Sequence, residues 1–501
     1  MSKLTGKKVL IFQQRSWGKI IGRFLAEKLA GEGCQLAALT FKKSTHELIV
    51  NQPNVNYDLI INHDEIMSRP KEYLGGDHYS LQQICDDLGI DSIWPIVSSL
   101  RNFVKSYGDK YYYSFRQNVS DEDTVLYIMA LYKAIRKIFK EFDPDVILAA
   151  NFVSLPHIMC SLYAKKRGRK MLTITDAKVQ GVYIFSYDYR DSEGPFYDRV
   201  AELNAGATST NAARARNYVK EFRSHFKQPD YVKAEGQKVS WLNRVKSRLA
   251  PYRQIINWYR HPSTEYMETT GITLDHRPPR IILRDARAER RYRRYMERRK
   301  YYELDEIGKF VYFPLQFQPE ASIDVAAPYF SNQIETARLV AMSLPDDYTL
   351  VVKEHPAMVG KRPPSYIEKI DRTVNIKLID YRTPNFEVIK RADLIVSPNS
   401  TTLAEAAFFN KPAIQLGDLG TTLKLPNVVK WSDLQTLAKK IKEMLVINLR
   451  TADYERRLEN FVAAAYDTNL KVNYIDLWEK GKLAERENLW QSYKQELEKI
   501  V

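Results

Sequence analysis

Two stretches carry the strongest pattern in this chain: residues 348–356 read YTLVVKEHP, and residues 393–417 read DLIVSPNSTTLAEAAFFNKPAIQLG. Each opens with a short apolar, β-branched run, which is the pattern of a strand buried in a parallel sheet. Each run ends in polar residues, and open α/β sheets bind their ligands at that carboxyl edge of the strands. The pair therefore predicts two strand–helix units that share one binding site.

The polar residues at these two edges are suited to hold a phosphate. The first edge offers Lys353 and His355, and the second offers Ser400, Thr401 and Thr402 directly before the helical pattern LAEAAFFN. Free backbone N–H groups and the helix dipole both favour negative charge at the start of a helix. We therefore expect a phosphate-bearing ligand between the two units.

Three pieces of the C-terminal half resemble bacterial capsule polysaccharide biosynthesis proteins. This family includes the transferases that move 3-deoxy-manno-octulosonic acid (Kdo) from CMP-Kdo. The pieces are VYFPLQFQPEAS (311–322), LPDDYTLVVKEHP (344–356) and SPNSTTLAEAAFFNKPAIQLG (397–417), in the expected order and spacing. The resemblance implies a GT-B glycosyltransferase: an α/β chain with two Rossmann-like domains facing a cleft, and the second domain binding most of the nucleotide sugar.

The same resemblance implies roles for single residues. His355 with Pro356 matches a His-Pro pair that contacts a phosphate of the leaving nucleotide, and Glu405 matches a glutamate that binds the ribose in many GT-B enzymes. Lys353 could reach the same phosphate or the carboxylate of an acidic donor sugar. The residues alone also allow a backbone-bonded histidine, a capping box at Glu405 and a salt bridge between Lys353 and Glu354.

Gln318 and Glu320 follow the predicted strand VYFPL, in a loop that Pro314 and Pro319 bracket. This loop should face the cleft, where Glu320 could bind the donor sugar or orient an acceptor hydroxyl. The plain alternative is a loop carboxylate in solvent.

Glycosyl transfer needs a base or a nucleophile that faces the donor from the other domain. Asp176 is the first candidate, because it follows the predicted strand MLTIT at a carboxyl edge. His157 is the second, and either residue could instead serve a turn or a helix start. The donor motifs contain no DxD, so we expect a metal-independent site without a cofactor.

Strand–helix alternation at both ends of the chain predicts its organisation. We expect an N-terminal Rossmann-like acceptor domain at 1–206 and a basic, mostly helical connector at 207–307. A C-terminal Rossmann-like domain for the nucleotide sugar follows at 308–431, and helices at 432–501 cross back to the first domain, as they often do in GT-B chains.

The chain has 501 residues and a formal net charge of +15, which indicates a polyanionic partner. The arginine-dense stretch from Arg280 to Tyr302 could contact an anionic membrane surface or glycan, or could be a solvated helix face. No RNA- or DNA-binding motif is present, so no nucleic acid is expected. Without an apolar run of about 18 residues, we expect a cytoplasmic protein, with peripheral contact to the inner membrane as a further option.

Together with these patterns, the resemblance to capsule polysaccharide biosynthesis proteins implies a glycosyltransferase of surface or capsular polysaccharide synthesis. It would transfer Kdo or a similar acidic sugar from a CMP-linked donor to a glycan or glycolipid acceptor. Two alternatives within enzymes are a CDP-glycerol-type polyol-phosphate transferase and a sugar-nucleotide epimerase. The alternative outside enzymes is a non-catalytic glycan- or membrane-binding assembly protein.

Overall fold

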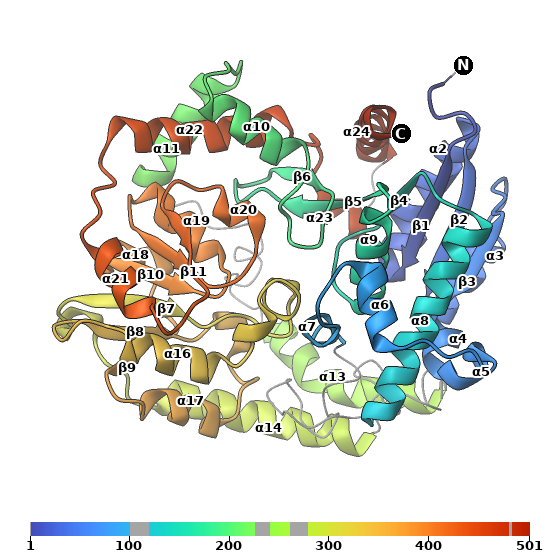
Figure 1. Cartoon of the computed structure of the whole chain (residues 1–501). Coiled ribbons are helices and arrows are strands. Elements are labelled where there is room, and N and C mark those ends of the chain that lie inside the picture. The colour runs from blue at the N-terminus through green and yellow to red at the C-terminus, as the bar shows by residue number, and fades with distance from the viewer. Residues whose placement is uncertain (1, 101–119, 226–240, 261–278, 480–482) are drawn as a thin grey trace.

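The computed structural model describes residues 2–100, 120–225, 241–260, 279–479 and 483–501. Two six-stranded sheets form two lobes that lie side by side in Figure 1. We call the lobe built on strands β1–β6 the N-terminal lobe and the lobe built on β7–β12 the C-terminal lobe. Among the described residues, no helix has the length and apolar character needed to cross a membrane.

The N-terminal sheet has the strand order β3-β2-β1-β4-β5-β6. Its strands are β1 (Lys8–Gln14), β2 (Gln35–Phe41), β3 (Leu59–Asn62), β4 (Val146–Leu148), β5 (Lys170–Asp176) and β6 (Tyr183–Ser186). Neighbouring strands run parallel, except that β6 is antiparallel to β5. This is the order of a Rossmann sheet, in which the strand sequence reverses between the first and fourth strands.

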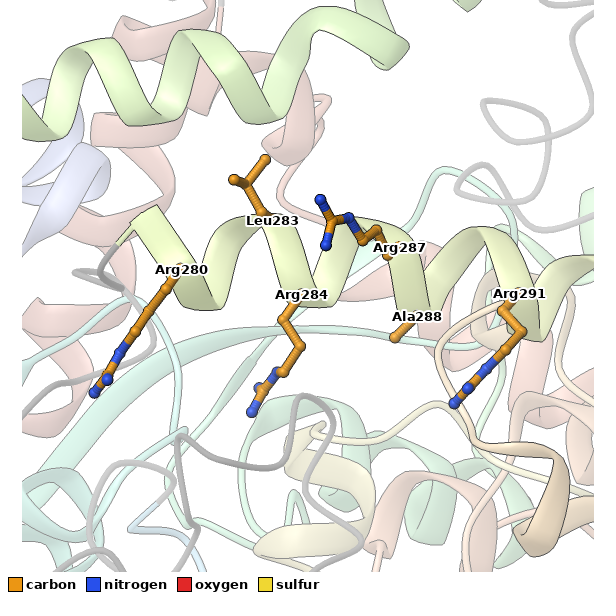
Figure 2. Close-up of a pocket in the computed structure, with 6 residues that line it drawn as sticks. All are labelled: Arg280, Leu283, Arg284, Arg287, Ala288 and Arg291. Carbon is orange, nitrogen blue, oxygen red and sulfur yellow. The ribbon is translucent and has the colours of Figure 1, made fainter.

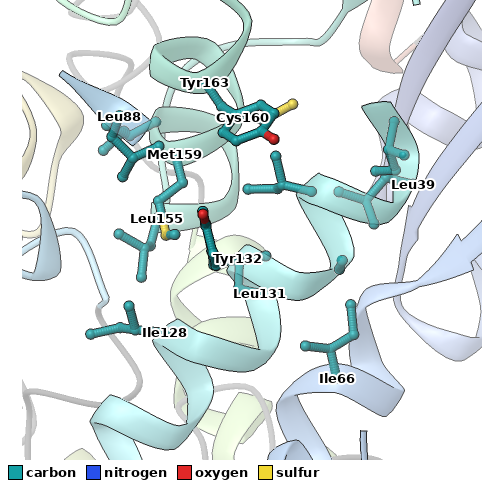
Figure 3. Close-up of a cluster of buried hydrophobic side chains, with 14 of the residues drawn as sticks. Leu39, Ile66, Leu88, Ile128, Leu131, Tyr132, Leu155, Met159, Cys160 and Tyr163 are labelled. Carbon is teal, nitrogen blue, oxygen red and sulfur yellow. The ribbon is translucent and has the colours of Figure 1, made fainter. Parts of the chain in front are cut away.

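Helices cover both faces of this sheet. They are α1 (Arg15–Trp17), a π-helical turn η1 (Gly18–Gly22), α2 (Arg23–Gly31), α3 (Lys43–Val50), α4 (His63–Ser68), α5 (Pro70–Leu74), α6 (Leu81–Leu88), α7 (Trp94–Val97), α8 (Asp121–Glu141) and α9 (Leu155–Lys165). Ser120 caps the long helix α8, and its hydroxyl accepts a hydrogen bond from the N–H of Asp123. Its apolar face joins one buried cluster with α9 and β2, including Leu131, Met159 and Leu39 (Figure 3).

The C-terminal sheet repeats the same order, β12-β11-β10-β7-β8-β9, and all its strands are parallel. The strands are β7 (Phe310–Pro314), β8 (Thr349–Lys353), β9 (Ile376–Ile379), β10 (Leu394–Ser397), β11 (Ala413–Gln415) and β12 (Val428–Lys430). The intervening helices are η2 (Leu304–Glu306), α15 (Ala321–Asp324), η3 (Pro328–Phe330), α16 (Gln333–Met342), η4 (Pro356–Met358), α17 (Pro364–Asp371), α18 (Asn385–Arg391), α19 (Thr401–Phe408), α20 (Gly420–Leu423) and α21 (Leu437–Leu445). Two sheets of this order confirm the predicted GT-B-like class with two Rossmann-like domains.

The last helices tie the two lobes together. They are α22 (Ala452–Asp467), α23 (Tyr474–Glu479) and α24 (Leu483–Ile500). Helices α23 and α24 pack on the N-terminal lobe, where Leu477 and Tyr493 share a buried cluster with Val9. In the same cluster the indole N–H of Trp17 donates to the Tyr474 hydroxyl at 2.7 Å. The chain therefore returns to its first domain.

Helices α10 (Pro195–Asn204) and α11 (Ala212–Ser224) follow β6 and pack on α22. Their apolar faces share a buried cluster with Phe408 of α19, in the C-terminal lobe. The division into four segments stays a prediction, and this packing crosses its first boundary at residue 206. Helix α10 belongs to the expected first domain by sequence but contacts the second lobe.

The basic connector contains two long helices, α13 (Trp241–Arg260) and α14 (Pro279–Arg298). They contact each other, and α14 also contacts α17 of the C-terminal lobe. Figure 1 places both helices at the lower edge of the view, beneath the two lobes. Residues 226–240 and 261–278 of the predicted connector lie outside the described residues.

Candidate functional site

The two edges predicted from the sequence meet at the centre of the C-terminal sheet. Strands β8 and β10 lie on either side of β7, so their carboxyl ends open to the same edge. The strand order reverses between β7 and β10, and ligands of doubly wound sheets bind in the crevice at such a reversal. The candidate site is therefore built around the ends of β7, β8 and β10.

Lys353 is the last residue of β8 and is buried, with 6% of its surface exposed. Its ammonium donates to the backbone carbonyl of Thr383 at 2.9 Å. Burial lowers the pKa of Lys353 to about 8, although the nearby carboxylates of Glu405 and Glu387 act in the opposite direction. A cation with this pKa is still largely charged at neutral pH, and it lies at the sheet edge where the sequence predicts a phosphate.

Glu354 does not pair with Lys353. Its carboxylate accepts a hydrogen bond from Arg362 at 2.5 Å, and both side chains are 1% exposed. The other end of the Arg362 guanidinium donates to the carbonyl of Gln316 at 2.6 Å. Glu354 also accepts from the N–H of His355 at 2.7 Å. This buried ion pair joins the loop after β7 to the loop after β8.

His355 is the N-cap of the short helix η4, and its Nδ1 accepts a hydrogen bond from the N–H of Ala357 at 3.2 Å. An accepting Nδ1 places the ring proton on Nε2, which leaves Nε2 as a donor. Burial, together with the positive charges of Arg362, Lys353 and Lys361, lowers the pKa of His355 to about 4. The ring is therefore a neutral hydrogen-bond donor at neutral pH in the ligand-free protein.

Ser400 caps the N-terminus of helix α19, where its hydroxyl accepts a hydrogen bond from the N–H of Thr402 at 3.1 Å. Ser400 is thus the N-cap among the three predicted hydroxyl residues. The helix begins at Thr401, which is half-buried and lines a pocket described below. The first turn of α19 therefore lies at the same edge as Lys353 and His355, as the sequence predicted.

Glu405 is the fifth residue of α19, too far along the helix for a capping box at Ser400. Its carboxylate instead accepts a hydrogen bond from the side-chain amide of Asn385 at 2.5 Å. The same amide donates to the hydroxyl of Thr402 at 3.3 Å, and its oxygen accepts from the Tyr312 hydroxyl at 2.9 Å. Burial raises the pKa of Glu405 to about 7, although Asn385 and Lys353 favour the charged form.

Gln318 and Glu320 both lie in the loop after β7, but the first is buried and the second is exposed. Gln318 is buried, donates to Asp324 at 3.3 Å and accepts from Gln333 at 3.1 Å, so its amide holds the loop itself. The Gln318–Pro319 peptide bond is cis. Glu320 is exposed and accepts from the Ser322 hydroxyl at 2.9 Å. A direct role for either residue in sugar binding stays a prediction.

The N-terminal lobe provides the wall of the candidate site that lies opposite the edge of the C-terminal sheet. Asp176 ends β5, and its carboxylate accepts from the N–H of Lys178 at 2.5 Å. It lines one pocket, which we call the interlobe pocket, together with Thr401 and Glu405 of α19. The turn from Lys178 to Gly181, the methyl group of Ala404 and the rings of Tyr218, Phe222 and Phe408 complete the lining. The structure therefore brings the predicted carboxylate next to two of the predicted donor-binding residues.

His157 does not line this pocket. It is 2% exposed in α9, where its Nδ1 lies 2.8 Å from the Ser154 hydroxyl and its Nε2 hydrogen-bonds Gln14. Burial lowers the pKa of His157 to about 3, so the ring is neutral. This arrangement matches the helix-start alternative, in which the histidine serves the local structure.

Sequence reasoning missed Asn385, Arg362 and Tyr218. Asn385 follows Pro384 at the start of α18, and a proline there signals only a helix start. Each of these side chains acts through a contact with an element distant in the chain, so no local pattern indicates it. In the part of the chain that the structure describes, no group of three His, Cys, Asp or Glu side chains gathers as metal ligands.

No family model matches the chain, and no curated protein matches it by sequence. Solved structures with a similar arrangement include KpsC of Thermosulfurimonas dismutans, a beta Kdo 2,7 transferase, at 12% identity and a TM-score of 0.34 over 66% of this chain and 80% of that one. The glycotransferase of kitacinnamycin has 10% identity and a TM-score of 0.25 over 99% of both chains.

A putative UDP-N-acetylglucosamine 2-epimerase from Listeria monocytogenes has 10% identity and a TM-score of 0.24, over 95% of this chain and 98% of that one. The neighbours thus include both transferases and epimerases. At these identities and TM-scores the likeness does not identify a function for this chain.

Proposed function

We propose that this chain is a metal-independent GT-B glycosyltransferase of surface or capsular polysaccharide synthesis. It transfers Kdo or a similar acidic sugar from a CMP-linked donor to a glycan or lipid-linked acceptor on the cytoplasmic side. The observation that carries this proposal is the interlobe pocket, where Asp176 of one lobe lines the same space as Thr401 and Glu405 of the other. A transferase needs its donor site and its base or nucleophile on opposite walls of one cleft.

The donor would bind at the edge of the C-terminal sheet. The N-terminus of α19 and the Nε2–H of His355 would donate to the phosphate, and Lys353 would contact the phosphate or the sugar carboxylate. Glu405, held by Asn385, would accept from the ribose hydroxyls. As the bond between the anomeric carbon and the phosphate oxygen breaks, these donors stabilise the charge that develops on the leaving CMP.

Asp176 would act on the acceptor side. As a base it takes the proton of the acceptor hydroxyl, while that oxygen attacks the anomeric carbon and CMP leaves with the bonding electrons. As a nucleophile it bonds the anomeric carbon first, while CMP leaves with the bonding electrons; the acceptor oxygen then displaces the carboxylate and gives up its proton to water. Both routes need the carboxylate at the interlobe pocket, so the proposal does not depend on the stereochemical course.

A thermal-shift screen against CMP, CDP, UDP, GDP and ADP tests the proposal, with His355→Ala measured beside the native chain. A ligand that binds only the folded state raises the melting temperature by linkage. We expect a CMP-selective shift that His355→Ala removes. A CDP-selective shift would favour the polyol-phosphate transferase, and a UDP-selective shift would discard the CMP donor. No shift with any nucleotide would favour the non-catalytic assembly protein.

A further inference from the structure

Helix α13 exposes a continuous apolar stripe. Its members are Leu249, Tyr252, Ile256 and Tyr259, which are 56%, 54%, 51% and 68% exposed. Their spacing of three, four and three residues puts them within an arc of about 80° on one helix face. The other large hydrophobic side chains exposed in the described residues are spread over several elements. A contiguous apolar face of this kind marks a contact surface.

Basic side chains border this stripe. Lys246, Arg253 and Arg260 lie along one side of it by helical position, Arg248 lies along the other side, and all four are exposed. The sequence of α13, WLNRVKSRLAPYRQIINWYR, contains no acidic residue. The helix is therefore amphipathic with a purely cationic border, the pattern of helices that lie in the interface of a membrane.

The neighbouring helix α14 adds positive charge. It contains eight arginines and three acidic residues, and it contacts α13. Arg280, Arg284 and Arg291 project to the same side of α14 and line a hollow on its surface (Figure 2). These arginines are exposed, so they raise the local positive potential beside α13.

We propose that α13 binds an anionic phospholipid bilayer, with the apolar stripe inserted among the acyl chains near the headgroups. The basic border and the arginines of α14 would contact lipid phosphates. A soluble polyanion would leave Leu249 and Ile256 in water, because aliphatic side chains neither stack on bases nor pair with charges. A second copy of this chain would bring one cationic helix against another, which like-charge repulsion disfavours.

This surface goes beyond the proposed function and does not depend on the donor. Both helices lie beneath the two lobes in Figure 1, so binding through α13 would hold the lobes against the membrane. An enzyme held in that way searches for a lipid-linked acceptor by diffusion in the plane of the membrane rather than through the volume of the cell. The surface would therefore favour the lipid-linked acceptor over a free glycan.

Co-sedimentation of the full chain with vesicles tests this proposal. We expect binding to phosphatidylglycerol-containing vesicles at least about tenfold tighter than to phosphatidylcholine vesicles, and weaker binding at high salt. Leu249→Ser/Ile256→Ser and Arg253→Glu/Arg260→Glu should each weaken binding to the anionic vesicles by about tenfold or more. All these side chains are exposed, so the folded state should be retained, which circular dichroism checks.

Two matched variants serve as controls. Val446→Ser/Ile447→Ser removes exposed apolar side chains elsewhere, and Lys220→Glu/Lys439→Glu reverses the same number of exposed charges. Both should bind vesicles as the native chain does. Equal binding of the stripe variants and the native chain would overturn the proposal. So would a concentration-dependent dimer that the stripe variants abolish without any change in vesicle binding.

Discussion

The Nδ1 atom of His355 accepts a hydrogen bond from the backbone N–H of Ala357 at 3.2 Å. This contact fixes the tautomer of the ring, and with a pKa lowered to about 4, mainly by burial, the ring is neutral in the ligand-free protein. A neutral Nε2–H can donate to a phosphate across the whole physiological pH range. We therefore predict that the His-Pro motif contributes a fixed hydrogen-bond donor and that Lys353 contributes positive charge.

We expect His355→Ala to weaken CMP binding by about 10- to 100-fold. A hydrogen bond to a charged group contributes about 1.5–3 kcal/mol, and its loss leaves a phosphate oxygen without that donor. The dissociation constant, measured by calorimetry between pH 5.5 and 7.5, should change by the same factor at each pH, because the ring is neutral throughout. A mutational effect that grows steeply toward low pH would show instead that a protonated His355 binds the phosphate.

Lys353 should make the binding of an anionic donor dependent on pH. Its pKa is lowered to about 8, so the amine loses its proton as the pH rises through 8, below the usual range for lysine. Binding an anion then requires proton uptake, and the dissociation constant should rise by up to about tenfold per pH unit above pH 8. Lys353→Gln should bind more weakly at pH 7 and show a flat profile from pH 7 to 9.5.

The exposed residue Lys369 provides the control for that profile. Lys369→Gln should keep the native affinity and the native rise above pH 8. If Lys353→Gln retains the rise, another group titrates in this range and Lys353 does not contact the anion.

The sequence predicts the parts of this site that are local. The runs TLVV and LIVS predict buried strands, and the polar residues after them lie at one edge because parallel strands end together. Asn385 and Arg362 escape prediction because their partners, Glu405 and Glu354, lie on other elements. The sequence does not predict Tyr218 as a pocket residue for the same reason, since α11 contacts α19 only in the folded chain.

Breaking the buried pair of Glu354 and Arg362 should destabilise the C-terminal lobe. Arg362→Met leaves a carboxylate in a position where it is 1% exposed, and removing one partner of a buried ion pair costs about 3–5 kcal/mol. Denaturant unfolding should show this loss. The double variant Glu354→Leu/Arg362→Met removes both charges and should recover much of the stability. A double variant as unstable as the single one would show that the pair's other hydrogen bonds, to Gln316 and His355, are more important than its charge.

Asp176→Asn should abolish transfer without weakening nucleotide binding. An asparagine oxygen can still accept from the N–H of Lys178, so the turn after β5 keeps its hydrogen bond. The amide cannot take a proton or attack the donor, and the rate should fall by about 10²- to 10⁴-fold. The dissociation constant for CMP, measured by calorimetry, should equal that of the native chain. A large loss of CMP affinity would instead place Asp176 in the donor site.

Gly420→Ala should disturb the contact between the lobes. Gly420 starts α20, and its N–H donates to the carbonyl of Arg190, in the loop between β6 and α10, at 2.7 Å. A Cβ on Gly420 would lie 2.2 Å from the carbonyl oxygen of Asp191 and 2.5 Å from the Cα of Ser192. Backbone atoms cannot move aside like a flexible side chain, and three hydrogen bonds from the loop's backbone N–H groups to Asp188 stiffen the loop.

The alanine must therefore push the loop away from α20, at a cost of about 1–3 kcal/mol, the usual range for overpacking. We expect a lower melting temperature together with slower transfer, because the interlobe pocket depends on the same contact between lobes. Gly308→Ala is the control, since a Cβ there meets no atom within 4 Å, and it should keep both properties. If Gly420→Ala lowered the melting temperature but left transfer unchanged, this loop would stabilise the chain without setting the geometry of the pocket.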